Sequence, residues 1–262
     1  MNTIVLSMIV VGAAGLLFGI ILTCASKMFA PETDPGVEQA LAALPGINCG
    51  ACGQGGCRAF AEAVVRKEAP VDGCVAGGDE VGIKIAGIMG LPVKIKQKTR
   101  AVLLCNGGRK VKDKFKYSGL KDCKAVNLIF GGQKECLDGC LGFGSCVEAC
   151  PFEAIEMGPE GLPIVDLQRC TGCGKCVKSC PMGLIILIPR LKNIVVRCNS
   201  REKGAVINKI CENGCIGCKK CENVCEEGAI KVVDNLAQID YTKCTNCGKC
   251  IEVCPKGTIV SV

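Results

Sequence analysis

The chain opens on its longest apolar run, Ile4 to Leu22, which contains no charged side chain. Its 19 residues are about the length that an α-helix needs to cross the hydrocarbon core of a membrane. Gly12, Gly15 and Gly19 fall on one face of such a helix, which favours close packing against other membrane helices. No charged segment precedes the run, unlike in a cleaved signal peptide. We therefore predict an uncleaved transmembrane anchor.

The charge next to this run indicates on which side of the membrane the remaining chain lies. Lys27 follows the run, and no side-chain charge precedes it. Positive residues gather on the cytoplasmic side of membrane-spanning helices. The body of a single-pass protein is therefore expected in the cytoplasm, where thiols stay reduced.

Beyond the anchor, hydrophobic positions come in shorter segments. An apolar helix candidate lies within residues 31–46, and a lysine-rich linker is expected over residues 84–98. After the linker, short β-type stretches recur, each behind a cysteine-rich loop, at residues 154–157, 185–188, 230–233 and 259–262. This recurrence predicts an internal repeat from about residue 100 onward.

Composition directs these segments toward metal chemistry. The chain has 25 cysteines among 262 residues and neither histidine nor tryptophan. A chain of this length can bury ordinary cores without disulfides. The lack of histidine excludes Ser–His and Cys–His nucleophilic pairs, histidine-ligated haem and mixed Cys/His zinc sites. Any chemistry must therefore depend on thiolates and the metal that they bind.

The spacing of the cysteines identifies the metal. A Cys-x2-Cys-x2-Cys-x3-Cys run is typical of bacterial two-cluster ferredoxins, in which three thiolates bind one [4Fe–4S] cluster and the fourth crosses to its neighbour. The three copies are Cys170, Cys173, Cys176 and Cys180; Cys215, Cys218, Cys221 and Cys225; and Cys244, Cys247, Cys250 and Cys254. Proline follows the first and third copies, whereas Glu226 follows the second. Zinc tolerates looser spacing, so three copies favour iron–sulfur clusters.

A fourth copy precedes these three and is altered. Aligned on the later copies, Cys140, Cys146 and Cys150 keep their places, whereas Phe143 stands where a ligand is expected. We predict that Cys136 supplies the missing ligand.

The crossing rule then assigns ligands to two clusters in each half of the repeat. In the first half the predicted sets are Cys136, Cys140, Cys146 and Cys180, and Cys150, Cys170, Cys173 and Cys176. In the second half they are Cys215, Cys218, Cys221 and Cys254, and Cys225, Cys244, Cys247 and Cys250. Each half is expected to be a ferredoxin-like unit of helices on a small antiparallel sheet.

A separate module carries Cys49, Cys52, Cys57 and Cys74. Four glycines around the first three cysteines allow the backbone to fold tightly and to aim N–H groups at the sulfurs. We predict one further [4Fe–4S] cluster here, with structural zinc as the alternative.

These segments give an α+β fold class. The predicted parts are a transmembrane anchor over residues 1–26, a four-cysteine [4Fe–4S] domain over 32–92, ferredoxin-like unit 1 over 100–190 and ferredoxin-like unit 2 over 191–262.

Outside the anchor, four cysteines remain unassigned: Cys105, Cys123, Cys198 and Cys211. Cys105 and Cys198 each follow a strand-like stretch and precede asparagine, and Cys211 has the offset in the second half that Cys136 has in the first. They are either buried structural thiols or ligands of a sixth cluster. The prediction is five [4Fe–4S] clusters, with the sixth left open.

The clusters change how the charge is interpreted. The formal net charge is +7, but an oxidised [4Fe–4S] unit with four thiolates carries about −2, so five units bring the total to roughly −3. The basic residues are therefore interpreted as local compensation. Nucleic acid is not expected as a partner, because few aromatic residues accompany the charges.

Several segments resemble the B subunit of the Rnf complex: LPGINCGACGQGGC, CNGG, CLGFGSCVEACPFEAI and CTGCGKCVKSCP. The likeness covers essentially the whole chain, and the second unit resembles the longer, clostridial-type forms. The resemblance implies an electron-transfer subunit of an ion-translocating ferredoxin:NAD oxidoreductase in a prokaryotic cytoplasmic membrane. Such a subunit accepts electrons from reduced ferredoxin and passes them to cluster- and flavin-bearing membrane subunits.

The sequence itself agrees with a relay role. It contains no G-x-G-x-x-G motif and no P-loop, so no catalytic residue is predicted, and NAD chemistry and ion transport are assigned to partners. Five lysines near the loops either steer an acidic ferredoxin or balance cluster charge: Lys175, Lys178, Lys219, Lys220 and Lys249. Two alternatives are a related complex that keeps an iron–sulfur transcription factor reduced, and a self-standing anchored ferredoxin. The glycine face of the anchor argues against the latter.

Overall fold

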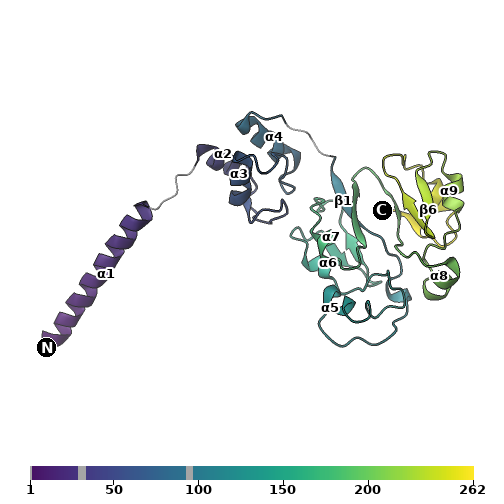
Figure 1. Ribbon diagram of the computed structural model, residues 1–262, viewed down its shortest axis with the longest axis horizontal. Coiled ribbons are helices and arrows are strands. Elements are labelled where there is room, and N and C mark those ends of the chain that lie inside the picture. The colour runs from purple at the N-terminus through teal and green to yellow at the C-terminus, as the bar shows by residue number, and fades with distance from the viewer. Residues whose placement is uncertain (1, 29–33, 93–96) are drawn as a thin grey trace.

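A computed structural model describes residues 2–28, 34–92 and 97–262 (Figure 1). The predicted start of the four-cysteine domain at residue 32, and residues 93–96 of the predicted linker, lie outside the described residues. Along the long axis of Figure 1 come helix α1 (Asn2–Met28), a small helical domain and two units that contain β-strands. The α+β fold class is therefore confirmed.

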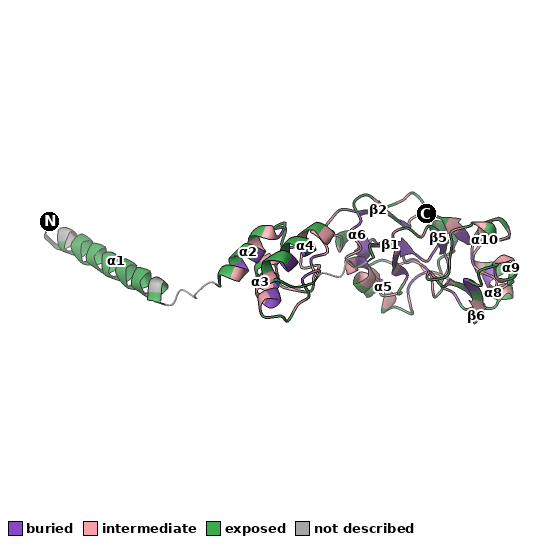
Figure 2. Ribbon diagram, turned by 90° about the horizontal axis from the view of Figure 1, so that it is seen from above, coloured by how far each residue is buried: buried purple, intermediate pink, exposed green. Residues whose placement is uncertain are grey.

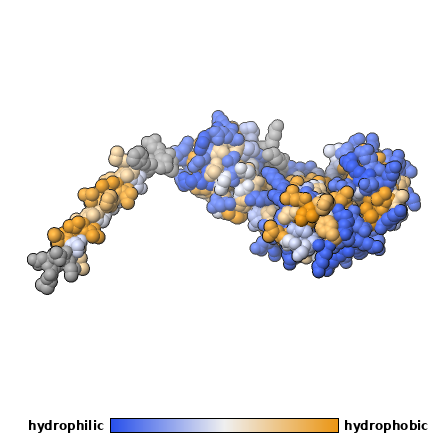
Figure 3. Space-filling view, turned by 60° about the horizontal axis from the view of Figure 1, so that its bottom comes forward, coloured by the Kyte–Doolittle hydropathy of each residue, from blue (hydrophilic) through white to orange (hydrophobic). Residues whose placement is uncertain are grey.

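Helix α1 contains the predicted apolar run. Residues Leu6–Ser26 are long and apolar enough to cross a membrane, and none of that span is buried within the protein. Figure 2 shows the coloured part of the helix almost entirely exposed, and Figure 3 shows its apolar surface beside a largely hydrophilic body. An exposed apolar helix of this length needs an apolar surrounding, which a bilayer provides.

The helical domain consists of α2 (Pro35–Ala43), α3 (Cys57–Val65) and α4 (Gly78–Met89). Helix α2 begins at Pro35 behind an N-cap, because the carboxylate of Asp34 accepts a hydrogen bond of 2.7 Å from the Gly36 N–H. The three helices pack around Ala40, Phe60 and Ile85, each no more than 2% exposed. This small core holds the four-cysteine loop in place.

The linker expected over residues 84–98 is wrong in its first part. Helix α4 continues to Met89 and ends where Gly90 adopts a left-handed conformation, with φ of 64°. Gly90 therefore ends helix α4, a signal that the interpretation of this segment as a lysine-rich linker overlooked.

Unit 1 is built from two two-stranded antiparallel sheets. Strand β1 (Thr99–Leu103) pairs with β4 (Ile185–Pro189), with Leu103 opposite Ile185, and β2 (Ile155–Met157) pairs with β3 (Pro163–Val165). Along the chain, four short helices lie between these strands: η1 (Gly108–Lys110), α5 (Cys123–Asn127), α6 (Ser145–Glu148) and α7 (Lys175–Ser179). The sheets and helices enclose a core that includes both aliphatic side chains and cysteines.

Unit 2 repeats this order of strands. Strand β5 (Ile194–Val196) pairs with β8 (Ile259–Ser261), and β6 (Ile230–Val233) pairs with β7 (Leu236–Ile239). Its helices are α8 (Gly204–Ile210), α9 (Lys220–Val224) and α10 (Lys249–Glu252). In each unit the first strand therefore closes on the last, while the middle two form a hairpin.

The four β-type stretches expected from the sequence correspond to β2, β4, β6 and β8, while β3 and β7 are not among the expected strands. A small core joins the two units: Val102 and Ile188 of unit 1 pack with Val195 of unit 2. At the same place the buried guanidinium of Arg100 donates to the carbonyl oxygens of Lys192 (2.7 Å) and Val262 (3.0 Å). We call this junction the seam.

Candidate iron–sulfur sites

Each ferredoxin-type loop turns through a left-handed residue into a short helix that carries the third cysteine of the run. The turning residues are Gly144 before α6, Gly174 before α7, Lys219 before α9 and Gly248 before α10, with φ between 61° and 82°. The third cysteines, Cys146, Cys176, Cys221 and Cys250, are all buried. The glycines of the motif therefore act through backbone geometry, which points thiols inward.

In the helical domain, all four predicted ligands border one hollow of about 330 Å³: Cys49, Cys52, Cys57 and Cys74. Gly50 and Gly53 have positive φ, so the loop can curl around this space. Burial raises the pKa of the Cys74 thiol, although the Gly77 N–H donates to its Sγ at 3.4 Å.

In unit 2 the structure brings the two predicted sets together. One hollow of about 360 Å³ is bordered by Cys215, Cys218, Cys221 and Cys254, and a second of about 360 Å³ by Cys225, Cys244, Cys247 and Cys250. In each set one cysteine comes from the other run, as the crossing rule requires.

Unit 1 follows the same plan for one of its sets. Burial raises the pKa of Cys176 to about 12, and the Cys173, Cys170 and Cys146 thiols raise it further. Cys150, which completes the predicted set, packs on the same core.

The other set predicted in unit 1, which includes Cys136, has a more complex environment. Burial raises the pKa of Cys146 to about 11, and the Cys123 and Cys180 thiols raise it further. Burial also raises the pKa of Cys136, but here the thiols that raise it further are those of Cys105 and Cys198. The Cys123 thiol therefore lies near Cys146, and the Cys136 thiol lies near Cys105 and Cys198.

A hydrogen-bond network explains how Cys123 reaches this position. The Cys123 N–H donates to Ser145 Oγ at 2.8 Å, and that hydroxyl donates to the Asp122 carboxylate, also at 2.8 Å. Asp122 caps helix α5 through the Ala125 N–H. Phe143, which stands in place of a ligand, makes an edge-to-face contact with Tyr117, with ring centroids 5.5 Å apart. The segment before the altered run thus packs against it and brings the Cys123 thiol near the run.

The fourth cysteine of each run has a common environment. Its Sγ accepts the N–H of the residue four positions later: Ala154 to Cys150 (3.4 Å), Leu184 to Cys180 (3.4 Å) and Ala229 to Cys225 (3.3 Å). At Cys254, burial raises the pKa, but N–H groups from Ile259, Lys256 and Thr258 outweigh it and lower the pKa overall. Such bonds stabilise thiolates and tune cluster potentials.

The geometry of the thiols fits clusters better than single ions. Tetrahedral zinc with four thiolates holds its sulfurs about 3.8 Å apart, because each Zn–S bond is about 2.3 Å. Among the residues that the structure describes, no three or more metal-ligating side chains lie close enough to hold one ion. Four thiols spaced around an open hollow instead suit a cube with iron at its corners.

Comparisons with known proteins agree with this chemistry. Residues 44–76 match the family described as "Putative Fe-S cluster", and residues 134–184 and 214–258 match a "4Fe-4S dicluster domain". A second "4Fe-4S dicluster domain" family matches residues 169–230. The chain is 46% identical to the B subunit of the proton-translocating ferredoxin:NAD(+) oxidoreductase complex of Clostridium ljungdahlii, over 93% of this chain and 87% of that protein.

The chain belongs to the family of Rnf complex B subunits. It is also 40% identical to the B subunit of the Na(+)-translocating ferredoxin:NAD(+) oxidoreductase complex of Acetobacterium woodii, over 93% of this chain and 74% of the relative. A third relative, the B subunit of an ion-translocating oxidoreductase complex of Methanosarcina acetivorans, is 40% identical over 93% of this chain and 92% of its own length. The chain is therefore an iron–sulfur electron-transfer subunit of a membrane-associated oxidoreductase complex.

Proposed function

We propose that this chain accepts electrons from reduced ferredoxin at unit 2 and relays them through [4Fe–4S] clusters to membrane partner subunits. The observation that carries the proposal is the arrangement of thiols in successive groups, from unit 2 through unit 1 to the helical domain. When bound, the clusters supply one-electron oxidation and reduction, each ferredoxin losing the electron that a cluster gains.

The exposure of the cysteines supports entry at unit 2. Outside helix α1, the exposed cysteines among the described residues are Cys218 and Cys247, both in unit 2. The equivalent positions in unit 1 are Phe143 and Cys173, which are both partly buried. Because electron transfer slows steeply with distance, a soluble donor is served best by the clusters with exposed ligands.

The charges around these ligands suit an acidic donor. Lys219 and Lys220 are exposed and border the hollow that contains Cys218. Lys249 is paired with Glu226 at 2.6 Å, so its charge is partly neutralised. Two exposed cations beside a cluster steer negatively charged partners and accelerate association at low ionic strength.

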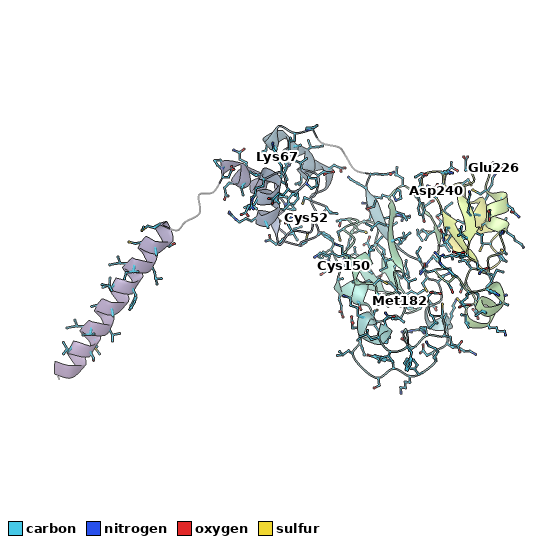
Figure 4. The ribbon with its side chains drawn as sticks, in the orientation of Figure 1. Cys52, Lys67, Cys150, Met182, Glu226 and Asp240 are labelled. Carbon is cyan, nitrogen blue, oxygen red and sulfur yellow. The ribbon has the colours of Figure 1, made fainter. Side chains whose placement is uncertain are left out.

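The other end of the relay leads toward the membrane. Lys175, in the cluster loop of unit 1, donates to the carbonyl oxygen of Cys49 in the helical domain. Figure 4 shows Cys52 on the side of that domain that faces unit 1, whereas Glu226 lies at the outer edge of unit 2. The helical domain in turn follows helix α1. We infer a single-pass anchor with the clusters on the cytoplasmic side of a prokaryotic membrane.

A division of labour follows from what the chain contains. The sequence has no dinucleotide or P-loop motif, and residues 4–22 carry no ionisable group that could move an ion. Flavin- or cluster-bearing partner subunits therefore carry out NAD chemistry and ion transport.

The test measures how fast reduced ferredoxin reduces the complete, cluster-loaded chain in an anaerobic stopped-flow experiment. Lys220→Glu places a negative charge at the proposed docking surface, so we expect the second-order rate constant to fall about tenfold at low salt and less at high salt. Lys178→Glu makes the same charge change at an exposed lysine of unit 1 and is the matched control. Equal slowing by both variants, or no slowing by Lys220→Glu, would contradict entry at unit 2.

A further inference from the structure

Four cysteines that the ferredoxin runs do not use meet at the seam. Cys105 and Cys136 of unit 1 and Cys198 and Cys211 of unit 2 border one hollow of about 420 Å³. The hollows of unit 2, which hold complete ligand sets from the runs, are each about 360 Å³. A hollow bordered by four thiols, as in the hollows of unit 2, therefore occurs where neither unit alone provides a site.

The Cys105 thiol lies near each of the other three thiols. Those near Cys136 are Cys105 and Cys198, and the ones near Cys198 and Cys211 include Cys105. Gly107 lies between two of them, because a Cβ at that position would be 3.5 Å from Cys211 Sγ and 3.9 Å from Cys105 Sγ. The cysteines therefore face a common space rather than separate pockets.

The internal repeat relates the four cysteines as two pairs. Cys105 comes two residues after β1, and Cys198 comes two residues after β5, the equivalent strand. Cys136 precedes the cluster loop of unit 1 by four residues, and Cys211 precedes that of unit 2 by the same offset. Each unit thus contributes a strand-end thiol and a loop-entry thiol from equivalent positions of the repeat. Buried thiols scattered as core residues would not be expected to show this pattern.

We propose that Cys105, Cys136, Cys198 and Cys211 bind a sixth [4Fe–4S] cluster at the seam between the two units. The proposal deepens the proposed relay, on which its functional meaning rests. It also replaces the role that spacing alone predicts for Cys136, whose place in unit 1 is taken by Cys123.

The surroundings of the hollow suit a buried, negatively charged cluster. The half-buried Arg197 borders it, and its guanidinium is attracted by the Cys105 and Cys140 thiolates. Cys140 also borders the hollow, where its N–H donates to Cys105 Sγ at 3.4 Å. Besides Cys105, the Cys123 and Cys146 thiols also raise the pKa of Cys140. We therefore assign Cys140 to the set that contains Cys123 and Cys146. A cation and an N–H donor lower the cost of burying the charge.

The position of the site gives it two roles. It lies beside the Cys140 set of unit 1 and, through Cys198, beside Cys215 of unit 2. A cluster there would link the cluster pairs of the two units for one-electron transfer. It would also tie the units together, as does the bond from Ser200 Oγ to the Asp138 carboxylate across the seam (2.8 Å).

The first measurement is iron and acid-labile sulfide per complete chain, purified anaerobically in detergent. Six clusters give about 24 of each and five give about 20. We expect about 24. A value of about 20 with intact reduction by ferredoxin would overturn the sixth cluster and leave the proposed function standing.

Ligand variants then test which cysteines share the cluster. Cys136→Ser and Cys211→Ser should each lose about four irons, and the double variant should lose about four as well, since both remove the same cluster. Cys123→Ser with Cys211→Ser should lose about eight, because they belong to different clusters. Cys24→Ser, in helix α1, is the matched control and should lose none. Additive loss in the first pair, or zinc in place of iron and sulfide, would refute the proposal.

Discussion

Unit 1 and unit 2 have the same four strands in the same pairing, yet they present their cysteines differently. Unit 2 exposes Cys218 and Cys247, whereas all cysteines of unit 1 are buried or partly buried. The difference begins at one position of the loop, where unit 1 has Phe143 and unit 2 has Cys218. Two copies of one fold thus differ in how far their thiols are open to solvent.

The substitution at this position changes more than a ligand. In unit 1 the loop keeps its backbone, since Gly142 and Gly144 have positive φ like their counterparts in the unaltered runs. The aromatic ring instead packs on Tyr117, and the segment that carries Tyr117 also brings in Cys123. One segment therefore covers the loop and, as we propose, supplies the fourth thiol as well. We infer that replacing the loop cysteine by Phe143 shields the cluster of unit 1 from solvent.

The largest expected effect follows from this exchange. Cys123→Ser should remove one cluster of unit 1, about four irons per chain, and the broad cluster absorbance near roughly 400 nm should fall in proportion. Adding Phe143→Cys restores the ligand at the position used in unit 2, so the double variant should regain most of the lost iron. The measurement is iron and sulfide on the complete chain.

A matched variant makes this result interpretable. Phe143→Cys alone keeps Cys123 and should hold the wild-type iron content. If Cys123→Ser kept its iron, or if Phe143→Cys failed to rescue while the other clusters remained, the assignment of Cys123 would be wrong, and the altered run would have another fourth ligand.

A smaller effect concerns accessibility. Exposed ligands leave the clusters of unit 2 open to solvent, so a chelator with mild oxidant should release about eight irons in a fast phase and the rest slowly. Cys218→Ser combined with Cys247→Ser removes both exposed-ligand clusters and should abolish the fast phase. Cys123→Ser should keep it. A fast phase that survives the double substitution would show that unit 1 or the helical domain is the more accessible part.

The two units also differ in how far their sites can be predicted from sequence. In unit 2 the spacing of each run dictates its set, because three thiols lie on one tight loop and the fourth follows a single helical turn. The same reasoning puts Cys136 into the altered run of unit 1, since it is near in sequence. Cys123 reaches that site only through the contacts of Asp122 with Ser145, which no spacing rule describes.

The strands show a similar limit. Strands β6 and β8 consist largely of apolar β-branched residues, which predict strands, whereas β3 and β7 are not among the strands expected from the sequence. Strand β7 follows Asp234 and Asn235, which have φ of 48° and 64° and form the tight turn of a hairpin. Such Asp/Asn pairs are a recognisable hairpin signal between apolar stretches, so this strand is predictable in principle. Strand β3 is only three residues long and begins with Pro163, so its own composition gives little indication of a strand.

The smallest expected effect compares the turning residues of the loops. Three of these four residues are glycine, but unit 2 has Lys219 at φ of 61°, where a side chain is strained. Lys219→Gly should therefore stabilise unit 2, by less than about 1 kcal/mol because glycine also gains freedom in the unfolded chain. Lys219→Ala removes the same charge but keeps a Cβ, so it should give no such gain. Anaerobic thermal loss of the cluster absorbance measures the difference between the two variants. A lower midpoint for Lys219→Gly than for Lys219→Ala would mean that the lysine is held by contacts worth more than its strain, and that the loop of unit 2 is shaped by its side chain rather than by its backbone.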